Sequence, residues 1–143
     1  MSSAVDVAAR ALARRDRSET DVRRILARKG VPEVEAEEAL ERLRDLGALD
    51  DARFAAGRAM ALAERGYGDV AIAARLTRVG VKRELVDAAV SALAPEQDRA
   101  AALAARRGGT LRTARWLAGR GFGSDSIESA VPAIADTQAP ELG

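Results

Sequence analysis

Three glycines carry the same surrounding frame of residues, and this internal repeat strongly limits the possible folds. The glycines are Gly30, Gly80 and Gly121, and six further columns align around them without a gap. The aligned sets are Leu12, Leu62 and Leu103; Arg15, Arg65 and Arg106; Leu26, Leu76 and Leu117; Val31, Val81 and Phe122; Leu40, Val90 and Val131; and Leu43, Leu93 and Ile134. A repeat of this size is typical of stacked units that form an extended binding surface, rather than of one enclosed active site.

Apolar residues recur at helical spacing inside each repeat, as in Val22, Ile25 and Leu26, and no stretch alternates long enough to predict a strand. Turn residues interrupt this spacing at equivalent places in the three repeats. The expected helices cover residues 5–16, 18–29, 33–46, 51–65, 69–79, 83–94, 97–107, 110–120 and 124–135. The sequence therefore predicts an all-α chain of three tandem three-helix modules at residues 4–50, 51–95 and 96–135, with a disordered tail at 136–143.

Several residues mark the expected helix ends. Ser18 and Thr110 are predicted N-caps, and the Asp50-Asp51 pair is expected to cap the helix that follows it. Each repeated glycine stands where a helix commonly ends with a residue of positive φ. Pro132 falls inside the last expected helix and should shorten or kink it.

The apolar columns also identify the expected cores. Each helix is short with one apolar stripe, and isolated helices of this length are marginal in water, so the helices must be held by packing against one another. We expect Leu26, Leu76 and Leu117 to lie at the centres of the three modules.

The amino-acid composition limits the kinds of chemistry and the cellular location that we expect for the chain. The chain has no cysteine and no histidine, so it lacks thiolate chemistry, the commonest general base and the commonest transition-metal ligand. Charged residues interrupt every apolar stretch, which leaves no candidate membrane span or signal peptide and predicts a cytoplasmic protein.

Charge is unevenly distributed although the net charge is only +1. Residues 10–30 carry eight basic and three acidic side chains, whereas residues 31–50 carry two basic and seven acidic ones. Residues 99–124 hold six arginines and no acid. Basic patches on a nearly neutral chain are compatible with a phosphate backbone or an acidic protein face as partner.

Two groups of residues resemble functional sites, but each is better explained by its place in the helical repeat. The Gly119–Ser124 run is rich in glycine, but it lacks the preceding strand and the Lys-Ser/Thr pair of a phosphate-binding loop. The five glutamates of residues 33–41 are spread around a helix axis and are expected to form a solvated face. We therefore expect no cofactor, no metal and no catalytic residue.

Basic residues recur on the first and second helices of the repeats and form the candidate contact face. They are Arg15, Arg23, Arg24, Arg28 and Lys29; Arg65, Arg75 and Arg78; and Arg106, Arg112, Arg115 and Arg120. Such a face would suit phosphates or an acidic protein surface. The alternative is an ordinary arginine-rich surface. Trp116, the only tryptophan, is interpreted as a packing residue, with an exposed contact aromatic as the alternative.

The connection between the first two repeats carries a recognisable motif. Residues 43–55 read LRDLGALDDARFA, and this stretch resembles the signature of the RecX family, the bacterial regulators of the RecA recombinase. Shorter matches follow the same family pattern over Leu12–Glu19, Leu26–Gly30, Arg65–Gly68 and Leu117–Phe122. The resemblance runs from about Val5 to Ile134. Ala48 and Val79 depart from the residues that the family often has at those positions.

The resemblance implies a non-catalytic protein of three three-helix modules in an elongated, curved array. Similar proteins lodge in the groove of the RecA–DNA filament, restrain ATP hydrolysis and strand exchange, and limit filament growth or promote its disassembly. It implies a monomer whose partner is the RecA filament, with DNA contacted mainly as part of that complex. The sequence leaves open a helical module that binds DNA without RecA, and an enzyme is the weakest alternative.

Overall fold

The computed structural model describes residues 3–133, and in that range every regular element is an α-helix. The nine helices are α1 (Ala4–Arg14), α2 (Glu19–Arg28), α3 (Glu33–Asp45), α4 (Asp51–Glu64), α5 (Asp69–Arg78), α6 (Arg83–Ser91), α7 (Glu96–Arg107), α8 (Leu111–Gly119) and α9 (Ser124–Ala130). The all-α prediction is confirmed.

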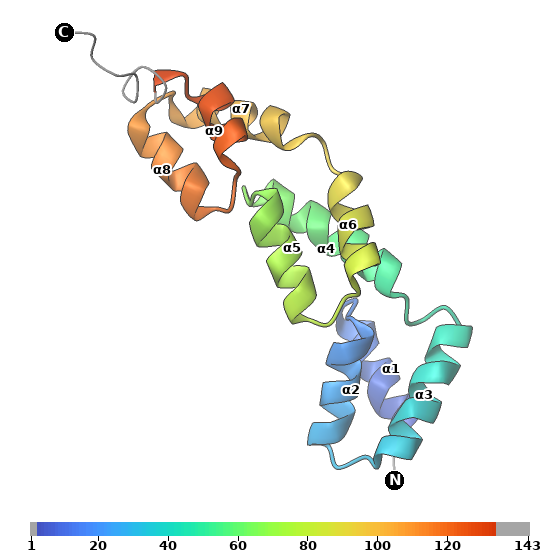
Figure 1. Ribbon diagram of the computed structural model, residues 1–143. Coiled ribbons are helices and arrows are strands. Elements are labelled where there is room, and N and C mark those ends of the chain that lie inside the picture. The colour runs from blue at the N-terminus through green and yellow to red at the C-terminus, as the bar shows by residue number, and fades with distance from the viewer. Residues whose placement is uncertain (1–2, 134–143) are drawn as a thin grey trace, which may run out of the picture.

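The helices follow one another in groups of three along an elongated molecule, with α1–α3 at one end and α7–α9 at the other (Figure 1). Each group surrounds its own cluster of buried apolar side chains. Leu26, Leu76 and Leu117 are completely buried, one in each cluster, as the repeat predicted. Burial of one such side chain contributes about 1.5–3 kcal/mol, so each short helix depends on its own cluster for stability.

Most helix ends lie within two residues of their expected positions, and two helices are shorter than expected. Helix α6 ends at Ser91 instead of residue 94, because Pro95 disfavours helical geometry at Ala94. Helix α9 ends at Ala130, two residues before Pro132, as the proline predicted. The expected tail at 136–143 and the core position Ile134 lie outside the described residues.

The predicted caps are present. The side chains of Ser18, Asp50 and Thr110 accept hydrogen bonds from backbone N–H groups three residues further on, at 3.1, 3.1 and 3.3 Å. Gly30, Gly80 and Gly121 have φ values of 80°, 84° and 86°, the left-handed geometry expected after a helix.

Hydrogen bonds join the first group of helices to the second. The Ser18 hydroxyl donates to the Val79 carbonyl at 2.6 Å, and the Asp51 carboxylate accepts from the Glu19 N–H at 2.8 Å. The first acidic residue of α4 thereby satisfies the free N-terminal amide of α2, which belongs to the preceding group.

The second group is joined to the third in a similar way, by a carboxylate at the start of a helix. The Glu96 carboxylate, at the start of α7, accepts from the Asp69 N–H at 2.7 Å. It also accepts from the Gly123 N–H at 2.9 Å and the Ser126 hydroxyl at 2.7 Å. Backbone contact is direct here as well, because the Gly68 N–H donates to the Arg120 carbonyl at 2.8 Å. These bonds hold neighbouring groups in a defined orientation.

Within residues 3–133 no helix is both long and apolar enough to cross a membrane.

Candidate interaction surfaces

Amides of the glycine-rich Gly119–Ser124 run are engaged within the protein. The Gly121 and Phe122 N–H groups donate to carbonyls of α8, and the Gly123 N–H donates to Glu96. The run is therefore the end of α8 and part of the junction with α7.

The acidic face of α3 is likewise engaged in pairing. Arg23 Nε donates to Glu37 at 2.7 Å, and this hydrogen bond lowers the pKa of the Glu37 carboxyl. Within residues 3–133, no three or more carboxylates come together in a way that could hold a metal ion. The glutamates of α3 thus lie on a solvated, partly paired face.

The twelve candidate basic residues fall into different surroundings. Arg23 and Arg24 on α2 are paired with acids, since Arg23 contacts Glu37 and Glu19 and Arg24 lies 3.7 Å from Asp21. Their charges are locally balanced, so they are weaker candidates for contact with an anionic partner than the sequence indicated.

Arg65, Arg75 and Arg120 instead gather around two aromatic rings. The guanidinium carbons of Arg75 and Arg120 lie 4.3 and 4.4 Å from the centroid of the Tyr67 ring, and that of Arg65 lies 5.8 Å away. Arg120 is also 5.0 Å from the centroid of the Trp116 ring. These residues come from the α4–α5 connection, α5 and α8, so the contacts cross from the second group of helices to the third.

Arg107 extends this arrangement, because its guanidinium carbon lies 3.7 Å from the Trp116 ring centroid. We call Arg107, Trp116, Arg120, Tyr67 and Arg75 the arginine–aromatic row. An aromatic face orients a guanidinium without neutralising its charge, whereas a carboxylate would neutralise it. The row therefore presents oriented cations that remain able to bind phosphate or carboxylate.

The sequence reasoning missed Tyr67 and Arg107 as members of this surface. Tyr67 stands between two glycines in the connection that follows α4. Trp116 was interpreted as a packing residue, with an exposed contact aromatic as the alternative. Its side chain is half-buried against the third cluster, and the guanidinium groups of Arg107 and Arg120 also lie close to its ring. The sequence signal for this surface was the presence of arginines near an aromatic residue in both the second and the third repeat.

Arg28 and Lys29 lie at a different place, in a cavity of about 660 Å³ between α1 and α2. Three further arginines of the first repeat, which were not among the candidates, line the same cavity: Arg10, Arg14 and Arg17. No acidic side chain is among the lining residues.

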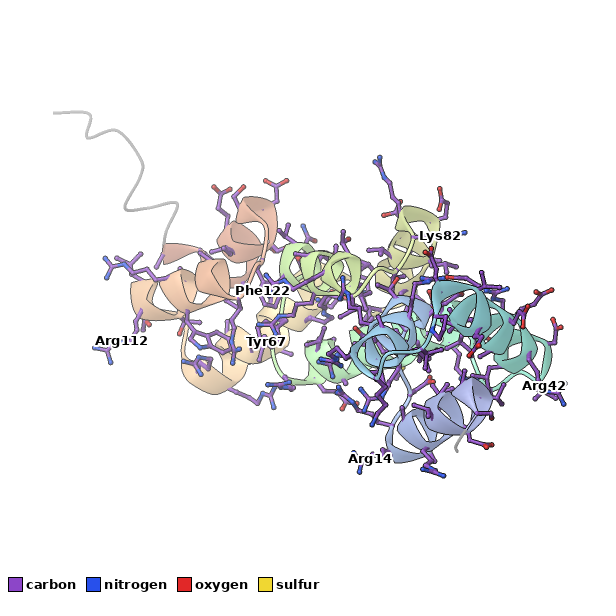
Figure 2. All side chains as sticks on the ribbon, turned by 90° about the horizontal axis from the view of Figure 1, so that it is seen from below. Arg14, Arg42, Tyr67, Lys82, Arg112 and Phe122 are labelled. Carbon is purple, nitrogen blue, oxygen red and sulfur yellow. The ribbon has the colours of Figure 1, made fainter. Side chains whose placement is uncertain are left out.

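The remaining candidates are spread over the surface. Arg15 lines a smaller cavity of about 290 Å³ together with Asp16 and Asp21. Four others are exposed and form no ion pair with a carboxylate of residues 3–133: Arg78, Arg106, Arg112 and Arg115. Figure 2 shows Arg14 on α1 of the first group well apart from Arg112 on α8 of the third group, so cations are distributed along the molecule.

Models of the RecX family match two parts of the chain. The model described as the first three-helix domain of RecX matches residues 4–43, and that of the second three-helix domain matches residues 50–90. These matches cover α1 to most of α3 and α4 to most of α6.

Curated relatives are similar over most of the chain. A regulatory protein RecX of Halorhodospira halophila is 36% identical over 138 residues, which cover 90% of this chain and 86% of the relative. A regulatory protein RecX of Xanthomonas oryzae pv. oryzae is 35% identical over 129 residues, covering 83% of this chain and 81% of the relative.

Solved structures have a similar fold. The crystal structure of RecX from Lactobacillus salivarius aligns with a TM-score of 0.79 at 17% identity, over 92% of this chain and 94% of that one. A second crystal structure, of a regulatory protein RecX, aligns with a TM-score of 0.70 at 24% identity, over 90% of this chain and 74% of that one.

Proposed function

This chain belongs to the RecX family, and from that premise we propose that it is a non-catalytic regulator that binds the RecA–DNA filament and restrains RecA. Binding would slow ATP hydrolysis and strand exchange and limit extension of the filament, in recombination and repair of DNA in the cytoplasm. The regulator would act as a monomer and would need no cofactor.

The observation that carries this proposal is the distribution of cations along an elongated array of helices (Figure 2). The cavity cations lie on the first group, and the arginine–aromatic row joins the second group to the third. A helical polymer repeats the same acidic or phosphate-bearing surface at regular intervals. Several weak contacts to successive repeats add through effective concentration, so each contact can be weak while the whole binds tightly.

A regulator of this kind acts without chemistry of its own. The chain has no histidine, the commonest general base, and no cysteine nucleophile. Contact with several neighbouring subunits at once would hinder the relative motion that each subunit needs during its ATP cycle. The proposed effect is therefore mechanical restraint of the filament.

The test is to add the purified protein to RecA on single-stranded DNA and to follow ATP hydrolysis and strand exchange. We expect both rates to fall at protein amounts below one per RecA subunit, because one array would contact several subunits. Unchanged rates at stoichiometric amounts would contradict the proposal.

Direct binding of DNA without RecA is the second candidate, and the arginine–aromatic row favours it. Cations next to aromatic rings are typical of surfaces that bind single-stranded nucleic acid. The measurement is DNA affinity in the absence of RecA as a function of salt. Affinity should fall steeply as salt rises if the arginines contact phosphates, and no binding at physiological salt would exclude this alternative.

A further inference from the structure

The cavity between α1 and α2 brings five cations together on the first group of helices. They are contributed by α1, by the connection after it, and by the end of α2: Arg10, Arg14, Arg17, Arg28 and Lys29. Nothing in the proposed binding of a filament requires cations to converge in this way, because a polymer is contacted equally well by cations spread over an open face.

Four of the five cations at the cavity are not paired with a carboxylate of the described residues. No carboxylate lines the cavity, and Arg14, Arg17, Arg28 and Lys29 form no ion pair with an acid of residues 3–133. Burial, and next the neighbouring Arg15, lower the pKa of the Arg17 guanidinium, while Asp21 acts in the opposite direction. A bound anion would reduce the mutual repulsion of these like charges.

One of these cations is held in place. Arg17 Nε donates a hydrogen bond to the Ala11 carbonyl at 3.1 Å, which fixes the guanidinium plane between the end of α1 and the start of α2. An oriented guanidinium can bind two oxygens of one phosphate group with less loss of side-chain entropy than a free one.

The remaining wall is apolar and the size is that of a small-molecule site. Val7, Ala11, Ala13 and Ile25 complete the lining. The volume of about 660 Å³ lies within the range of roughly 300–1,000 Å³ that is usual for small-molecule pockets. A ligand that fits must therefore carry several negative charges in a compact form and can place an apolar or flat part against α1 and α2.

From this arrangement we propose that the α1–α2 cavity binds a small oligophosphate, of which a nucleoside triphosphate is the representative member. The phosphates lie among Arg14, Arg17, Arg28 and Lys29, and the nucleoside lies toward Val7 and Ile25. The lining offers no side chain that distinguishes one base from another, so adenine and guanine nucleotides bind with similar affinity.

Calorimetric titration of the full chain, without RecA or DNA, tests the site with ATP, GTP, AMP and inorganic tripolyphosphate. We expect ATP, GTP and tripolyphosphate to bind with one-to-one stoichiometry and AMP to bind much more weakly, because it carries one phosphate. ATP affinity above that of tripolyphosphate identifies the nucleotide as the favoured source of the phosphates, and equal affinity identifies the phosphate chain alone. Absence of saturable binding by all of them overturns the proposal.

The double substitution Arg14→Gln with Arg28→Gln localises the site. Both side chains are exposed and neither forms an ion pair with a described acid, so the variant should fold, which circular dichroism checks. Loss of two charge-assisted contacts should weaken ATP binding by at least about tenfold. Arg42→Gln is the matched control, since Arg42 lies on α3 and does not line the cavity (Figure 2). Equal affinity of the double variant and the control overturns the assignment.

A short single-stranded oligonucleotide tests the competing explanation, in which the cavity is part of a nucleic-acid groove. If it binds more tightly than tripolyphosphate at equal phosphate concentration and is weakened by the same two substitutions, the cavity is part of a nucleic-acid groove and the proposal is wrong. Because RecA is absent from every arm, the outcome does not depend on whether the protein regulates the filament.

Discussion

Gly80 lies against Thr20 so closely that a Cβ atom added to Gly80 would overlap the Thr20 side chain. Gly80 follows the C-cap of α5 in the second group of helices, and Thr20 lies in the first turn of α2 in the first group. Gly121 is placed in the same way, since an added Cβ would lie 2.6 Å from the Cβ of Ala71 in the preceding group. Gly30 belongs to the first repeat, and an added Cβ there meets nothing within 4 Å.

The three glycines should therefore respond differently to substitution by alanine. Gly30→Ala should cost about 1–2 kcal/mol, because only the left-handed backbone geometry is strained. Gly80→Ala should cost more, because the methyl group also forces the first two groups of helices apart. Urea unfolding measures both, with Gly57→Ala inside α4 as the control that should be neutral or slightly stabilising. Equal losses at Gly30 and Gly80 would contradict the packing role.

The junction held by Glu96 should weaken in acid. Burial raises the pKa of the Glu96 carboxyl, but hydrogen bonds from Asp69, Gly123 and Ser126 outweigh that effect, and the pKa is lowered overall. The stability that Glu96 contributes is therefore present above its ordinary pKa of 4.5 and is lost as the pH falls through the lower folded value. The protection factor of the Asp69 amide against hydrogen exchange should fall over this range. Glu96→Gln should remove the pH dependence and cost about 1–3 kcal/mol.

Asp51, which holds the preceding junction, should respond in the opposite direction. Burial raises the pKa of the Asp51 carboxyl, although the hydrogen bond from the Glu19 N–H acts in the opposite direction. A raised pKa contributes stability that is present below the ordinary value of 3.8 and is lost as the pH rises through the folded value. Acid should thus loosen the junction between the second and third groups before the one between the first and second, and simultaneous loss of protection at the Glu19 and Asp69 amides would contradict this order.

Truncation of a central leucine should destabilise the chain strongly. Leu76 is completely buried in the second cluster, so Leu76→Ala should cost about 2–5 kcal/mol through lost burial and the cavity left behind. Leu46→Ala is the matched control, because Leu46 is 67% exposed and should change stability by less than about 0.5 kcal/mol. Denaturant unfolding at fixed temperature compares the two.

The arginine–aromatic row should carry part of the affinity for a phosphate-bearing partner. We expect the triple substitution of Arg75, Arg107 and Arg120 by glutamine to weaken binding to RecA-coated or bare DNA. Each lost phosphate contact should reduce the slope of log affinity against log salt by about one. Lysine at the same three positions keeps the charge but loses the planar stacking on the rings, so it should restore only part of the affinity. Arg42→Gln serves as the control, and an unchanged salt slope in the triple variant would place the contacts elsewhere.

Ion pairing with nearby carboxylates determines which cations remain available to bind an anion. Arg23 and Arg28 looked equivalent in the sequence because both are basic residues of one helix. The fold brings Glu37 of α3 against Arg23 and places Arg28 in the α1–α2 cavity instead. Such pairing depends on which helix faces lie opposite each other, and spacing within one helix does not specify it.

The helices, their caps and the buried leucines follow from the sequence alone, because they depend on local spacing and on the few conformations open to glycine and proline. The family also follows from the sequence, through the motif that links α3 to α4. The contacts of each repeated residue instead depend on how the helices pack. Gly30 and Gly80 stand in the same column and share the same backbone geometry, yet only Gly80 has a preceding group of helices to pack against, and that contact exists only once the groups are stacked.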